Sequence, residues 1–159
     1  MKGATEVVQV LNRVLYNELI AINQYLLHSR MLKNWGVTKL ADYEFKESVD
    51  EMRHADELVE RILFLDGLPN LQDLGKLFIG EDVEEILSCD LKLEQAALPT
   101  LQQGISVCEK HADFNSRELL VKILDSEEEH IDWLEAQFEL LKRMGLQNYV
   151  QLQSGAKEG

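Results

Sequence analysis

The chain has 159 residues, of which 45% are hydrophobic and 28% charged, enough for one domain with a substantial core. Its 29 acidic residues against 16 basic ones give a net charge of −13, which argues against binding to nucleic acid and suits the handling of cations. No apolar run approaches the roughly 20 residues that span a bilayer, and the first residues contain no hydrophobic signal core, so we expect a cytoplasmic protein without a membrane partner.

Apolar residues recur at helical spacing along most of the chain. We expect Thr38, Asp82 with Glu85, and Asn115 with Glu118 to cap the starts of helices. With two prolines and nine glycines, the composition favours an all-α protein, and we expect one domain over residues 1–159. The predicted helices cover residues 5–34, 38–65, 82–110 and 116–144, with a short fifth helix over 146–152.

The connection from Asp66 to Glu81 is longer than the two to eight residues usual between bundle helices. About fifteen extended residues cover roughly 50 Å, against roughly 40 Å for a helix of about 28 residues. The second and third helices can therefore run parallel, as two antiparallel hairpins joined by a crossover. We predict a disordered tail over 154–159, and we expect Cys89 and Cys108, too far apart on one helix to bridge, to be buried thiols.

One set of acidic and histidine residues occurs twice, at a constant offset of 76 residues. In a four-helix bundle, one Glu from each of two helices and a Glu-x-x-His from each of the other two project inward around a carboxylate-bridged pair of metal ions. Residues three apart on a helix lie about 5 to 6 Å apart, so a Glu and a His can bind the same ion. The predicted metal ligands and catalytic residues are Glu18, Glu51 and His54, repeated as Glu94, Glu127 and His130.

These carboxylates occupy helix positions where apolar residues are expected; Glu18, for example, continues the stripe of Leu15 and Ile22. Burying an ionised carboxylate costs several kcal/mol unless a positive partner is supplied. Two divalent cations would balance four glutamates and leave both histidines as neutral ligands. Carboxylate and imidazole favour iron or manganese over structural zinc, and we choose iron, which suits two-electron reduction of O₂ or peroxide.

Two further acids, Glu44 and Glu47, lie on the same helix face as Glu51, so the pattern leaves open which acids are direct ligands. We interpret Glu47 as a guide for incoming ions. Asp90 either orients a ligand histidine or is bonded to water.

Tyr25 and Trp133 flank the predicted site at helical spacing. Both are interpreted either as core residues or as electron donors to iron. We expect His28 and His111 to be surface residues.

Four segments resemble the bacterioferritin family, and the resemblance covers nearly the whole chain: residues 17–25, 50–56, 67–72 and 126–133. The resemblance implies a ferritin-like bundle, a hollow shell of 24 subunits, a ferroxidase centre in each subunit and a ferric mineral in the cavity. It also implies haem b shared by two subunits, each supplying one methionine. Met52 matches that methionine, and its neighbour Glu51 faces about 100° away from it.

The resemblance further implies that haem passes electrons to the mineral, with a small iron–sulfur ferredoxin as donor, so that iron leaves as Fe²⁺. Lys46 stands where relatives often carry a histidine, which leaves an inner-wall iron site with Asp50 in question.

The leading interpretation is an iron-storage ferroxidase that oxidises Fe²⁺ to Fe³⁺ with O₂ or H₂O₂. One alternative is a discrete di-iron oxidase or peroxidase without a shell. Another is a haem-carrying shell subunit for electron transfer, with structural glutamates. The sequence leaves open the oxidant, the haem occupancy, the path of iron into the protein and whether the shell contains one kind of subunit. It also leaves open whether the di-iron site is a stable cofactor or a gate.

Overall fold

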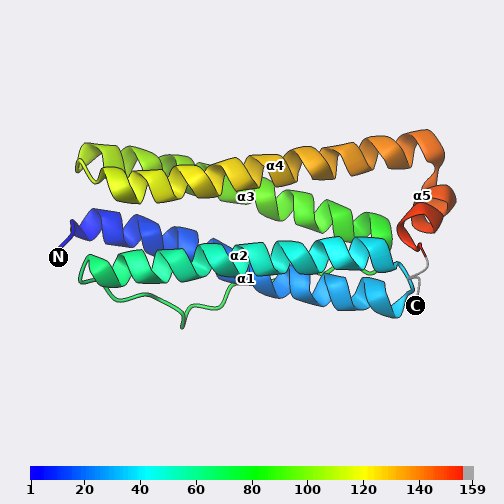
Figure 1. Ribbon diagram of the computed structural model, residues 1–159, viewed down its shortest axis with the longest axis horizontal. Helices are drawn as coiled ribbons and strands as arrows, with labels where there is room; N and C mark the ends of the chain where they lie inside the picture. Colours follow the sequence, from blue (N-terminus) through cyan, green and yellow to red (C-terminus); the bar gives the residue numbers. More distant parts are fainter. Residues whose placement is uncertain (156–159) are drawn as a thin grey trace.

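The computed structural model describes residues 1–155, which form five helices and no strand. In Figure 1, α1 and α4 run one way along a four-helix bundle, and α2 and α3 run the other way. The segment between α2 and α3 returns along the length of the bundle, so the predicted crossover and the parallel pair are confirmed. The helices are α1 (Thr5–Asn34), α2 (Thr38–Phe64), α3 (Val83–Lys110), α4 (Phe114–Met144) and α5 (Leu146–Gln153).

Only one of the predicted helix caps forms. The Asp82 carboxylate accepts a hydrogen bond from the Glu85 backbone N–H at 2.8 Å, as expected. Asn115 is not the cap of α4, because the helix already begins at Phe114. Asp113 is the cap instead, and its carboxylate accepts a hydrogen bond from the Ser116 backbone N–H at 3.0 Å. Asp113 also binds Arg61 of α2 at 2.8 Å, which fixes it in the capping position.

Thr38, the third predicted cap, already lies inside α2, and its hydroxyl donates to the carbonyl oxygen of Gly155 at 3.0 Å. The predicted disordered tail cannot be compared in full, because residues 156–159 lie outside the described residues. Cys89 is half-buried and Cys108 is buried, and both are free thiols.

The core consists of two apolar clusters, one at each end of the bundle, with a polar layer between them. The first packs the start of α1 against the end of α2, around Leu11, Leu58 and Leu120. The second packs the end of α1 against the start of α2 and includes Leu32 and Tyr149, the buried tyrosine of α5. Each fully buried leucine contributes about 1.5 to 3 kcal/mol, so these clusters offset the cost of the polar layer.

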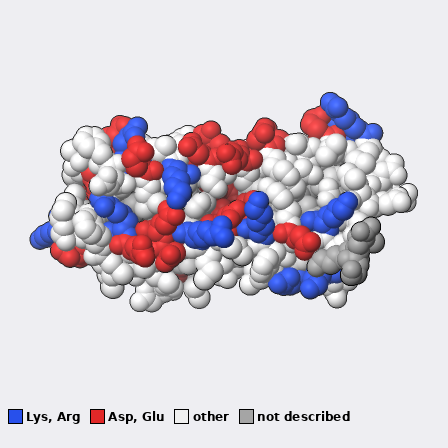
Figure 2. All heavy atoms as spheres, viewed as in Figure 1, with Lys and Arg blue, Asp and Glu red and all other residues white. Residues whose placement is uncertain are grey.

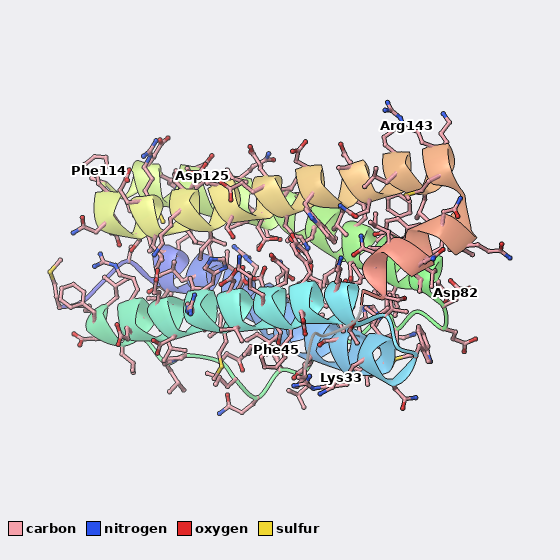
Figure 3. The ribbon with its side chains drawn as sticks, turned by 45° about the vertical axis from the view of Figure 1, so that its right-hand side comes forward. Lys33, Phe45, Asp82, Phe114, Asp125 and Arg143 are labelled. Carbon is pink, nitrogen blue, oxygen red and sulfur yellow. The ribbon has the colours of Figure 1, made fainter. Side chains whose placement is uncertain are left out.

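In Figure 3, nitrogen and oxygen atoms crowd the interior between α2 and α4 half-way along the bundle, whereas Arg143 points outward near the end of α4. No helix within residues 1–155 has the length and apolar character needed to cross a bilayer.

Candidate metal centre

One half of the candidate centre is built around His54 of α2. Carboxylate or imidazole atoms of Glu18, Glu51, His54 and Glu127 all lie within 4.8 Å of one another, and all four residues are buried. The Nδ1 atom of His54 lies 3.3 Å from Glu51 Oε2 and 3.6 Å from Glu18 Oε2. Three helices therefore bring four ligand groups to one point.

The other half is built around His130 of α4. Its Nδ1 atom lies 3.1 Å from Glu94 Oε1 of α3 and 3.5 Å from Glu47 Oε2 of α2. The Tyr25 hydroxyl donates a hydrogen bond to Glu94 Oε1 and lies 3.3 Å from His130 Nδ1. Tyr25 is fully buried, so its hydroxyl holds the Glu94 carboxylate in place from within the core.

Glu18 and Glu127 of the first half and Glu94 of the second line one small hollow of about 10 Å³. The pKa of Glu127 lies well above its ordinary value because the side chain is buried and faces the Glu51 carboxylate. All six residues that the repeat predicts are thus brought together. The hollow is too small for an organic substrate.

Glu94 and His130 of the centre hold protons more tightly than the same groups do in water. Burial raises the pKa of Glu94. Burial alone would lower the pKa of His130, but the hydrogen bond and charge of Glu94 raise it to about 9. Cations would displace these protons and replace their charge.

Several oxygen and nitrogen atoms that could bind a metal ion have no hydrogen-bond partner. They are Glu18 Oε2, Glu94 Oε2 and His130 Nε2, and all three are buried. Leaving such atoms unsatisfied costs about 1 to 3 kcal/mol each, more for charged groups. Among the described residues, none of the four glutamates pairs with a lysine or arginine; Glu18, Glu51 and Glu94 face histidines instead. The donor set of carboxylates and imidazoles fits iron or manganese.

Aromatic rings cover the His130 side of the centre. Tyr43 stacks on Trp133 with ring centroids 3.5 Å apart, and the Tyr25 ring lies edge-on to His130 at 5.2 Å. The sequence interpretation singled out Tyr25 and Trp133 but missed Tyr43. Its position one helical turn before Glu47 is the signal that could have revealed it.

The prediction that His28 lies at the surface is wrong, because the side chain is fully buried. His28 binds Asp90 of α3 at 2.8 Å and the Gly80 backbone at the end of the crossover. Asp90 therefore bonds His28 rather than either predicted ligand histidine. Glu44 joins these two residues in a separate buried cluster, so it is not part of the centre. His111 is exposed, as expected.

Met52 lies on the outer side of α2, with 63% of its surface exposed. It borders a mainly apolar pocket of about 460 Å³ that also contains Leu19, Ile22 and Leu71. An exposed thioether beside an apolar pocket fits a flat apolar group such as haem held between two copies of the chain.

A four-helix bundle with a long crossover and two inward-facing carboxylate–histidine half-sites defines the class of ferritin-like bundles that can hold a pair of metal ions. A family model described as "Ferritin-like domain" matches residues 8–144. The chain is 50% identical to the bacterioferritin of Mycobacterium bovis over 149 residues, which is 94% of each chain. It belongs to the ferritin family, among the bacterioferritins.

Two other relatives point to the same family. The chain is 46% identical to the bacterioferritin of Brucella melitensis over 152 residues, which is 96% of this chain and 94% of the relative. It is 45% identical to the bacterial ferritin of Pseudomonas aeruginosa over 154 residues, 96% of this chain and 99% of the relative.

Proposed function

We propose that this chain is a ferroxidase subunit of a cytoplasmic iron store. The buried set of four glutamates and two histidines carries this proposal, because several of its oxygen and nitrogen atoms are unpaired and no lysine or arginine among the described residues pairs with its carboxylates. Fe²⁺ is the substrate. Two Fe²⁺ ions each give one electron to O₂, which takes up two protons to become H₂O₂. Alternatively, they give both electrons to H₂O₂, which takes up two protons and becomes two molecules of water.

The residues of the chain have distinct parts in this reaction. Glu51 and Glu127 face each other in the cluster around His54 and are suited to bridge the two ions. His54 with Glu18 binds one ion, and His130 with Glu94 binds the other. The hollow beside Glu18, Glu94 and Glu127 has no room for an organic substrate, which favours iron oxidation over a discrete oxidase acting on organic substrates.

The family supports a storage shell around this chemistry. Relatives that are named bacterioferritin match almost the full length of the chain, and we infer a homo-oligomer of 24 copies with a ferric mineral inside. Figure 2 shows acidic side chains gathered over the middle of the face that carries α4. Acidic surfaces raise the local concentration of cations and so favour iron uptake. The exposed acids of α4 are Glu118, Asp125, Glu128, Glu129, Asp132, Glu135 and Glu139.

We further infer that Met52 from each of two subunits holds haem b. Bound haem would supply a path for electrons, from a small iron–sulfur ferredoxin, to stored Fe³⁺. Replacing Met52 with Leu keeps an apolar side chain but removes the sulfur ligand. The M52L protein should lose haem, release iron more slowly and retain both assembly and iron oxidation. Unchanged haem absorbance would contradict this role of Met52.

Aerobic uptake of Fe²⁺ by the purified protein tests the leading proposal. Oxidation should be rapid up to about two ions per subunit, and later iron should stay soluble and co-elute with a large assembly. Oxidation that stops there while further iron precipitates would favour a discrete di-iron enzyme. If Glu94→Ala left oxidation unchanged, the chain would instead be a haem-carrying shell subunit with structural glutamates.

A further inference from the structure

A second buried cluster of ionisable side chains lies beside the metal centre, and the proposed iron oxidation does not use it. It consists of His28 from α1, Glu44 from α2 and Asp90 from α3, all three fully buried. Their donor atoms lie within 4.8 Å of one another. Asp90 precedes Glu94 by one helical turn, so the cluster sits next to the His130 half-site.

The hydrogen bonds fix the state of His28. The backbone N–H of Gly80 donates to His28 Nε2 at 3.0 Å, so Nε2 carries no proton. Nδ1 must then carry the proton of the neutral ring, and it donates to Asp90 Oδ1 at 2.8 Å. A metal ion on Nδ1 would require the ring to lose both protons, which makes His28 a poor metal ligand while it bonds Gly80.

Only one of the two carboxyl oxygens of Asp90 accepts hydrogen bonds. Its Oδ1 atom accepts from His28 and also from Gln24 Nε2 at 3.0 Å. Its Oδ2 atom is buried without a partner, as are both carboxyl oxygens of Glu44. Within residues 1–155, no lysine or arginine pairs with either acid.

The groups that face Glu44 from the surrounding helices offer no compensating charge. They are His28 on α1, Glu47 on α2 itself, Asp90 on α3 and Tyr149 on α5. The Tyr149 hydroxyl donates to Gln137 of α4 at 2.8 Å rather than to Glu44. Burial and the neighbouring Asp90 charge raise the pKa of Glu44 well above its ordinary value. Two adjacent carboxylates in such surroundings cannot both be ionised at low cost.

We propose that Glu44 and Asp90 share one proton, held as a Glu44 carboxyl group that donates to Asp90 Oδ2, and that the pair releases this proton when divalent cations fill the metal centre. The metal-binding part of the proposed function is a premise of this inference, but iron oxidation is not.

The charges of the two sites act on each other. Asp90 and Glu94 lie one turn apart on α3 and accept hydrogen bonds from Gln24 and Tyr25, which are neighbours on α1. Charge at the pair therefore acts on the centre over a short distance. Glu47, which lies 3.5 Å from His130 Nδ1, also acts on Glu44. Each divalent cation that replaces a proton adds positive charge to the centre and favours ionised Glu44. Because such linkage is reciprocal, the shared proton weakens metal binding by the same factor.

Zn²⁺ tests this coupling, because it fills the centre without redox chemistry. Protons released by the assembled apo protein are counted with an indicator dye in weak buffer near pH 7. Glu44→Gln is the informative variant, since its amide still donates to Asp90 Oδ2 and preserves the fold but cannot ionise. Glu60→Gln, an exposed change on the same helix, is the matched control.

With two Zn²⁺ bound per subunit, E44Q should release about one proton fewer per subunit than the wild type and E60Q. Equal proton counts would overturn the coupling. A loss of one bound Zn²⁺ in E44Q would overturn the shared proton, because the cluster would then be a metal site. If the wild type bound no Zn²⁺ at Glu18, Glu94 or Glu127, the coupling would fail together with the proposed centre.

Infrared spectroscopy tests the shared proton separately. The difference spectrum between wild-type and E44Q apo proteins at neutral pH should contain the carbonyl stretch of a protonated carboxyl group. Absence of that band would overturn the pair even if iron oxidation were normal. Its presence in a protein that binds Zn²⁺ but fails to oxidise iron would leave the pair standing and remove only the ferroxidase proposal.

Discussion

The two half-sites of the metal centre are related by the same 76-residue offset in sequence, yet their surroundings differ. Tyr25 and Glu47, which contact the His130 half-site, correspond through this offset to Leu101 and Ile123. Both of these residues are buried in the first apolar cluster. The ligand pattern is therefore duplicated, but the residues that support it are not.

The same difference extends to the second buried cluster. Glu44 corresponds to Leu120, and Asp90 corresponds to Val14, again in the apolar cluster. One side of the centre is packed with hydrocarbon, and the other side carries hydroxyl, carboxyl and imidazole groups. The apolar side contributes stability, and the polar side handles protons and charge. Breaking the two sides in turn should therefore have different consequences.

The largest effect is expected where both half-sites fail together. Glu127→Ala removes a carboxylate that faces Glu51 and lines the same hollow as Glu94, and it should slow iron oxidation by roughly 100-fold or more. This exceeds the effect of losing a supporting residue. Glu128→Ala, an exposed neighbour, is the matched control and should oxidise iron normally. Stopped-flow absorbance measures the rate, and gel filtration checks that assembly is intact. A rate within twofold of wild type would show that Glu127 is not a ligand.

A test of pH dependence separates the half-sites without a mutation. Burial opposes the proton on His130, but Glu94 raises the pKa to about 9, so this proton competes with a metal ion below that pH. Affinity for the ion at this half-site should rise about tenfold per pH unit between pH 7 and 9, then level off. Calorimetric titration with Co²⁺ measures it. A pH-independent affinity for both ions over this range would contradict the assigned cause.

The helices and the burial of the candidate ligands could be predicted because both depend on local pattern. Apolar spacing located every helix end to within two residues, and Glu18 and Glu127 stood out as charges in apolar stripes. The burial of His28 could not be predicted from apolar spacing, because this burial depends on the contact of Gly80, in the crossover, with α1. Its place between Tyr25 and Leu32 on one stripe was the available signal.

The predicted cap of α4 was wrong for a related reason. Asp113 and Asn115 both have side chains that can cap a helix, and the contact with Arg61 from another helix decides between them. Choices between neighbouring polar residues depend on tertiary contacts, which local pattern does not contain.

A smaller effect is expected from the hydroxyl group that only the His130 half-site has. Tyr25→Phe keeps the buried ring but removes the hydrogen bond to Glu94, so oxidation should slow by roughly tenfold. Tyr16→Phe, a partly exposed change on the same helix, should leave the rate unchanged. The stoichiometry of two bound ions should persist in both variants. Loss of one bound ion in Y25F would make Tyr25 essential for metal binding rather than a support for Glu94.

The smallest effects come from one pair of corresponding positions, Glu47 and Ile123. Ile123→Val removes one methylene group from the apolar cluster and should lower the free energy of unfolding by about 0.5 to 1.5 kcal/mol, with an unchanged oxidation rate. Glu47→Gln removes a carboxylate beside His130 and should slow oxidation a few-fold, with little change in stability, because burial already disfavours its charge. Denaturant unfolding and stopped-flow rates on both variants make the comparison. If E47Q lost stability and I123V lost activity, the division between an apolar and a reactive side of the centre would be wrong.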